Sequence, residues 1–77
     1  MTHKLKNALF QRLNFDAQDA GMINMRNKEI GKKLQSTCTI LWKELNSTTN
    51  ISDELVSRLD SFHNDVEQSA KQTGLYK

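Results

Sequence analysis

The 77-residue chain contains no proline and only three glycines, the two residue types that most often interrupt helices. Its β-branched residues do not alternate with polar ones, as they do in a half-buried strand. Long helices can therefore form with few forced breaks. A chain of this length is limited to one domain. The sequence predicts that residues 1–77 form a single all-α domain.

The clearest helix is expected over residues 51–73. Apolar residues there recur at intervals of three and four, which places them on one face of a helix. They are Leu55, Leu59, Phe62, Val66 and Ala70. The opposite face carries Asp53, Ser57, Asp60, Asn64 and Glu67. Asn50 or Ser52 can cap the start of this helix, and Gly74 can end it, with Leu75 folding back onto the last turn.

A second helix is expected over residues 22–46, joined to the third by a polar cluster at residues 46–50. Its apolar stripe comprises Ile23, Ile30, Leu34, Cys38, Leu41 and Leu45. Asn27 falls within that stripe, where it either fixes the register or lies beyond the packed region. Gly31 can mark the close approach of another helix. The two helices are predicted to pack as an antiparallel hairpin.

The N-terminal segment predicts a shorter helix over residues 3–14, with Leu5, Ala8, Leu9 and Leu13 on one face. Such a helix is too short to persist alone, so it must dock on the hairpin or on a partner. Residues 15–21 are expected to be a linker, with Asp16 or Asp19 as possible helix caps. The predicted fold is a hairpin plus a short N-terminal helix, a three-helix protein. Because so small a domain has little stability to spare, we expect it to self-associate into a bundle.

The residues that carry chemistry are few. Cys38 is the only cysteine, so it is either a small core residue or a reactive thiol, and its isolation suits a reducing, cytoplasmic setting. His3 and His63 belong to no metal-binding motif, and no glycine-rich phosphate loop is present. His63 has Asp60 and Glu67 one turn away on either side. We expect no enzymatic activity, metal, cofactor or small-molecule substrate.

Several apolar residues lie off the predicted stripes and are candidates for a binding surface. They are Phe10, Met22, Met25, Ile40 and Trp42. Either the N-terminal helix covers them, or they contact another protein or a second copy of the chain. The longest uninterrupted apolar runs are three residues, so no membrane span is expected. We therefore expect a non-enzymatic protein-binding accessory factor, such as a stoichiometric regulator, inhibitor or adaptor.

The alternative function follows from the uneven charge of the chain. Residues 1–33 hold seven basic residues against three acids, and residues 34–77 hold four against six. A basic half can contact nucleic-acid phosphates. The candidate residues for a small nucleic-acid-binding protein are Lys4, Lys6, Arg12, Arg26, Lys28, Lys32 and Lys33.

Overall fold

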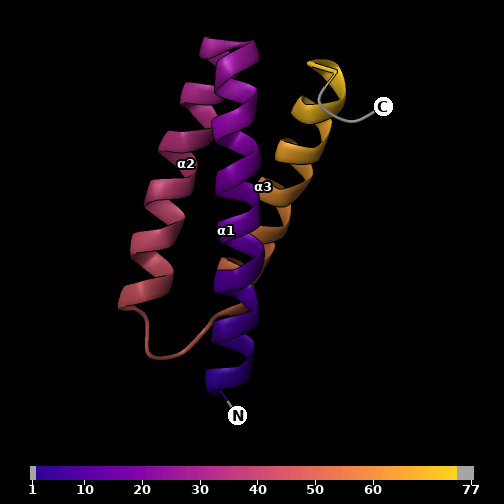
Figure 1. Ribbon diagram of the computed structural model, residues 1–77. Helices are drawn as coiled ribbons and strands as arrows, with labels where there is room; N and C mark the ends of the chain where they lie inside the picture. The colour runs from indigo at the N-terminus through magenta and orange to yellow at the C-terminus, as the bar shows by residue number, and fades with distance from the viewer. Residues whose placement is uncertain (1, 75–77) are drawn as a thin grey trace.

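The computed structural model describes residues 2–74, with side chains from Lys4 onward, as three α-helices with no strand in that range. They are α1 (Thr2–Arg26), α2 (Lys28–Ser47) and α3 (Asp53–Gln72). α2 runs antiparallel to α1, and α3 returns beside them (Figure 1). The predicted all-α, three-helix class is confirmed.

α1 is a single helix of 25 residues, so the predicted helix end near residue 14 and the predicted linker at 15–21 are wrong. Its buried face is spaced by four, three, four and three residues, and consists of Leu9, Leu13, Asp16, Ala20 and Ile23. Asp16 occupies a core-facing position in that series. The apolar stripe is therefore broken in the sequence although the helix is not. Asp16 and Asp19 lie within the helix and do not cap one.

The break between the first two helices lies at Asn27. Its backbone is extended, with φ −147° and ψ 104°, and its side-chain oxygen accepts a hydrogen bond from the Ile30 amide at 3.2 Å. Asn27 thus caps α2, which begins at Lys28, and the predicted start near residue 22 is wrong. Ile23 consequently packs from α1, not from α2 as predicted. One residue forms the whole connection between the two helices.

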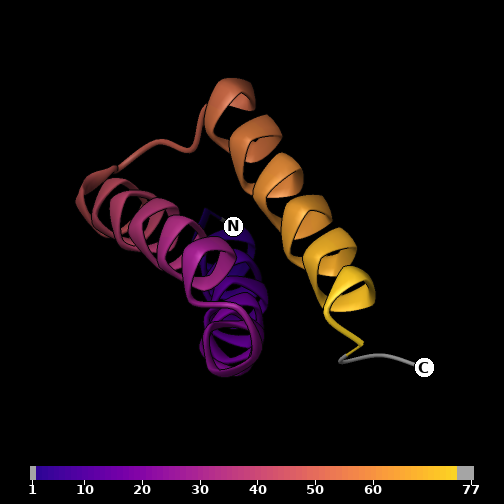
Figure 2. The same cartoon turned by 90° about the horizontal axis from the view of Figure 1, so that it is seen from above.

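Close packing of α1 against α2 depends on Gly31. Gly31 is buried, and a Cβ atom at this position would lie 2.2 Å from the Cα of Asn24 in α1. The expected close approach at this glycine is confirmed. Seen from above, α1 and α2 lie side by side while α3 is set apart from them (Figure 2). The tightest helix pair is therefore α1–α2, whereas the sequence predicted a hairpin of the last two helices.

The core forms where the three helices meet. α2 contributes Leu34, Cys38, Leu41 and Leu45, and α3 contributes the predicted stripe of Leu55, Leu59, Phe62, Val66 and Ala70. The interpretation of Cys38 as a core residue is confirmed. Ser52 caps α3 by accepting a hydrogen bond from the Leu55 amide at 3.1 Å. Gly74 has a φ of 77°, as expected at a helix stop; Leu75 lies outside the described residues.

The first turns of α1 differ from the prediction. Leu5 and Ala8 were placed on the docking face, yet both are exposed. The N-terminal end of α1 extends beyond the end of α2 (Figure 1), and Ala8 lies on the outward face of α1, next to the buried Leu9. None of the described helices combines the length and the apolar character needed to cross a bilayer.

Candidate functional site

Phe10 and Trp42 form an aromatic contact between α1 and α2. Their ring centroids are 5.0 Å apart and the rings are inclined by 56°. The Trp42 indole N–H donates to the side-chain oxygen of Asn14 at 3.3 Å, so it has the polar partner that an indole requires. Trp42 nevertheless keeps 41 % of its surface exposed. α1 therefore covers one side of this tryptophan and leaves the other accessible.

The other predicted partner-binding residues do not join Trp42. Met22 and Met25 are 49 % and 87 % exposed, but they belong to α1 and not to the second helix as predicted. Ile40 is also exposed, yet residues two apart on a helix project about 160° from each other, which turns it away from Trp42. Phe10 and Trp42 thus share one surface, and Met22, Met25 and Ile40 lie elsewhere.

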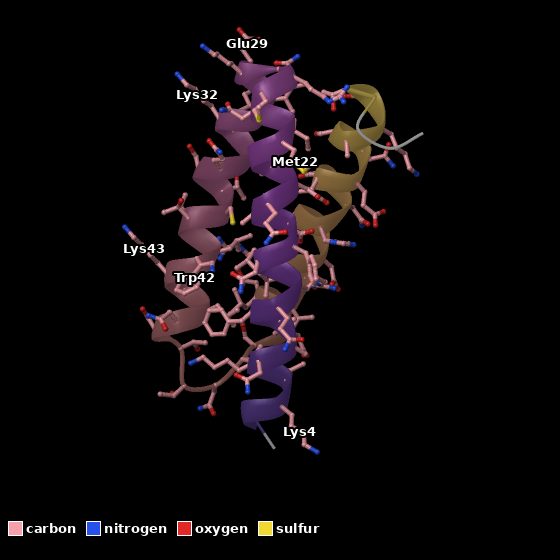
Figure 3. All side chains as sticks on the ribbon, in the orientation of Figure 1. Lys4, Met22, Glu29, Lys32, Trp42 and Lys43 are labelled. Carbon is pink, nitrogen blue, oxygen red and sulfur yellow. The ribbon has the colours of Figure 1, made fainter. Side chains whose placement is uncertain are left out.

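An open hollow of about 590 Å³ lies beside Trp42 in the groove between α1 and α2. Its lining consists of Ala17 from α1 and of Gln35, Cys38, Thr39, Trp42 and Lys43 from α2. This lining includes one cation and no acid. Lys32 and Lys43 project from the same side of α2 (Figure 3). Spacings of three and four residues connect Lys32, Gln35, Thr39 and Lys43 along one face.

Two acidic side chains of these helices point toward α3 instead. Glu44 of α2 pairs with Arg58 of α3 at 2.6 Å, and Asp16 of α1 contacts His63 of α3 at 2.7 Å. These contacts keep both carboxylates away from the hollow. The groove beside Trp42 therefore has an apolar floor and a positively charged edge.

The basic residues of the predicted nucleic-acid site are spread over the molecule. Three of them have contacts within the chain: Lys6 with the Thr48 carbonyl at 2.9 Å, Arg12 with Asp60 at 2.6 Å, and Arg26 with the Thr73 carbonyl at 3.2 Å. Lys28, Lys32 and Lys33 are exposed on α2. Lys4 lies at the opposite end of the molecule from Lys32 (Figure 3). The seven residues do not form one continuous face.

A buried carboxylate links α1 to α3. The Asp16 carboxylate lies 2.7 Å from Nδ1 of His63, and Nε2 of the same ring lies 3.1 Å from the Glu67 carboxylate. Burial raises the pKa of Asp16, and the hydrogen bond and charge of His63 and the charge of Arg12 oppose that rise. The sequence had grouped His63 with Asp60 and Glu67. Of these two acids, Glu67 contacts the ring, and Asp60 pairs with Arg12 instead.

The surroundings of Cys38 do not favour its reading as a reactive thiol. Burial raises the pKa of the Cys38 thiol, and the charge of Asp16 adds to the effect. A thiol held in its protonated form is a poor nucleophile. Within the part of the chain that the structure describes, no three histidine, cysteine or acidic side chains converge as a metal site would need. We interpret the Asp16–His63 pair as a structural contact between α1 and α3.

Among the smaller hollows between α2 and α3 are two with volumes of about 340 and 360 Å³. Both are lined by Thr37, Phe62 and Asp65. Their edges carry both signs of charge, with Arg58 and Glu54 at one and Lys33 and Asp65 at the other. Such mixed edges do not select a partner of either charge.

Comparisons with protein-family models, with curated proteins and with solved structures found no match. The functional proposals below therefore rest on the surfaces and contacts of the chain itself.

Proposed function

We propose that this protein is a non-enzymatic binding factor that takes an acidic, amphipathic helix of another protein into the α1–α2 groove beside Trp42. The observation that carries the proposal is the combination of an exposed tryptophan, an apolar floor and Lys43 in one hollow, with Lys32 further along the same face of α2. Tryptophan is enriched among residues that dominate binding energy. An amphipathic helix in a groove is a recurrent mode of recognition.

The shape of the groove supports a helix as the occupant. α3 lies on one side of the α1–α2 pair (Figure 2), and the residues that line the Trp42 hollow all belong to α1 and α2. Ala17 and Thr39 have small side chains, which allow another helix to approach closely. Apolar side chains of the partner would contact Trp42 and Ala17. Its carboxylates would meet Lys32 and Lys43 at the edge, where opposite charges guide association.

The only tryptophan of the chain provides the measurement. A synthetic peptide with leucine and glutamate at helical spacing should change Trp42 fluorescence saturably, because binding removes water from the indole. Added salt should weaken this binding, since exposed charges are screened. A peptide with the same leucines and with lysine in place of glutamate should bind less tightly.

Charge-reversed variants test the location of the site. Lys32→Glu combined with Lys43→Glu should lose most of the affinity for the acidic peptide. Lys71→Glu is the control, because Lys71 is exposed on α3 and lies outside the face of α2 that carries Lys32 and Lys43. The proposal fails if the acidic peptide leaves the fluorescence unchanged, or if Lys71→Glu weakens binding as much as the double change.

Nucleic acid is the competing partner, and the same titration separates it. An oligonucleotide that binds more tightly than the acidic peptide, and that loses affinity in the lysine variants, would replace the proposed partner by a phosphate backbone. The apolar floor argues for the protein helix, because phosphate contacts need no exposed tryptophan.

A further inference from the structure

The outward face of α1 carries an uncharged strip that faces away from the core. From residue 7 to residue 25, the charged residues of α1 are Arg12, Asp16 and Asp19. Asp16 and Arg12 contact α3, and Asp19 lies between Asp16 and Phe15 around the helix, at the border of the strip. The remaining face is exposed and consists of Ala8, Gln11, Phe15, Gln18, Met22 and Met25.

These six positions are spaced by three, four, three, four and three residues. That spacing is the one by which a helix presents a continuous seam to a second helix. The apolar members are well exposed, with 68 % of Phe15 and 87 % of Met25 accessible to solvent. The sequence alone had assigned Phe15 to a linker, which concealed the strip.

We propose that this strip, Ala8 to Met25 on α1, packs antiparallel against the same strip of a second copy of the chain. A surface that meets its own copy must avoid placing like charges opposite each other, and a strip without ionisable groups meets this condition. The exposed faces of α2 and α3 include rows of lysines or acids, such as Lys32 and Lys33 or Asp60 and Glu67. The α1 strip is thus suited to a partner of identical sequence.

The antiparallel orientation follows from side-chain size. Pairing the strip about its midpoint places Ala8 of one copy opposite Met25 of the other, so a small residue meets a large one. Phe15 then lies next to the two-fold axis. A parallel pairing would set Ala8 against Ala8 and leave a gap in the contact.

The size of the strip sets the strength of the dimer. It is about 26 Å long and about 10 Å wide, on the order of 300 Å² per chain. A standard stable interface covers about 800 Å² per partner. The dimer is therefore weak and reversible, and it forms as the protein concentration rises. The Trp42 groove lies on a different side of α1, so the dimer does not depend on the proposed function.

Sedimentation equilibrium of the full chain tests the inference over a range from low to high micromolar concentration. The average mass of the unaltered protein should rise from 8.9 kDa toward twice that value. Phe15→Glu and Met22→Glu should each remain at the monomer mass, with unchanged helical circular dichroism. A constant monomer mass for the unaltered protein, or full association of Phe15→Glu, would overturn the inference.

Ile40→Glu is the matched control, because it places the same charge at an exposed apolar residue outside the strip. It should associate like the unaltered chain, and an equal loss of association would indicate non-specific aggregation. A mixture of Phe15→Glu with Phe15→Lys should regain the dimer mass, since opposite charges then meet near the two-fold axis. If the mixture stays monomeric while each variant alone is monomeric, Phe15 does not face its own copy and the antiparallel pairing is wrong.

Discussion

A methyl group on Gly31 of α2 would lie 2.2 Å from the Cα of Asn24 in α1, and 2.6 Å from its backbone nitrogen. Backbone atoms cannot rotate away as a side chain can, so α2 would have to move. Gly31→Ala should therefore lower the free energy of unfolding by about 1–3 kcal/mol or more, as expected for overpacking. Chemical denaturation followed by circular dichroism measures the change.

Gly21 provides the control for this prediction. It also lies inside a helix, yet a Cβ atom there would meet nothing within 4 Å. Gly21→Ala should raise the free energy of unfolding by up to about 1 kcal/mol, because alanine favours helix over glycine. If both substitutions stabilise the protein, α1 and α2 do not approach each other as closely as described.

Core and surface positions of α3 should differ strongly in their tolerance of alanine. Leu59 and Phe62 are each 2 % exposed. Leu59→Ala or Phe62→Ala should cost about 2–5 kcal/mol, because each leaves a cavity in the core. Asn64→Ala, on the exposed face, should change the melting temperature little. The reverse ranking in thermal melts would show that the faces of α3 are misassigned.

The buried Asp16 makes stability depend on pH in a direction opposite to that of a salt-bridged carboxylate. Its pKa is raised in the folded protein, mainly by burial. Near these pKa values the folded state binds more protons than the unfolded state. The stability that Asp16 contributes in its protonated form is therefore present below its ordinary pKa, and it is lost as the pH rises through the raised pKa of the folded protein. Asp16→Asn removes this titration, so the free energy of unfolding of the variant should fall less as the pH rises.

Urea denaturation across the mildly acidic range, comparing the unaltered chain with Asp16→Asn, measures the difference. The amide oxygen of asparagine can still accept a hydrogen bond from His63, so the contact itself is retained. Asp60→Asn is the matched control, since Asp60 is exposed and its ion pair with Arg12 contributes little. A pH profile altered equally by the two substitutions would show that Asp16 is not responsible.

Sequence pattern was sufficient for α3 and for most of α2, where the residues of the predicted apolar stripes repeat at helical spacing and face the core. It failed where a polar residue takes a core position. Asp16 resembles a cap in sequence, and only the contact with His63, 47 residues away, explains its burial. The residues next to Asp16 in the sequence do not indicate that His63 is its partner. The continuous spacing from Leu9 to Ile23, read with Asp16 included, would have revealed α1.

The break between α1 and α2 at Asn27 was missed in the sequence for a related reason. Ile23 and Ile30 are seven residues apart, so they fit one continuous helical stripe as well as two separate helices. The capping hydrogen bond to the Ile30 amide decides between them. As for the surfaces, the sequence identified Trp42 and the methionines as unusual, but the uncharged strip and the groove became visible only once the helices were placed.

Asn27→Ala tests the strength of that cap. Alanine cannot accept the hydrogen bond from the Ile30 amide, and it favours helical backbone where Asn27 is extended. The substitution should cost about 0.5–2 kcal/mol. Ser52→Ala, at the start of α3, should cost a similar amount and is the comparison for a cap away from the α1–α2 break. If Asn27→Ala and the unaltered protein are equally stable in urea, Asn27 does not cap α2 as described.

Because a single residue separates α1 from α2, straightening it would turn residues 2–47 into one rod, about 69 Å long. α2 and α3 would then be carried out of reach of their own α1. Two such opened chains can exchange halves, each rebuilding the Gly31–Asn24 contact with the other's α1. An exchanged pair shares its core, so it would survive dilution, whereas a dimer held by the α1 strip would not. The extended backbone of Asn27 is therefore what keeps α2 folded back against the α1 of its own chain.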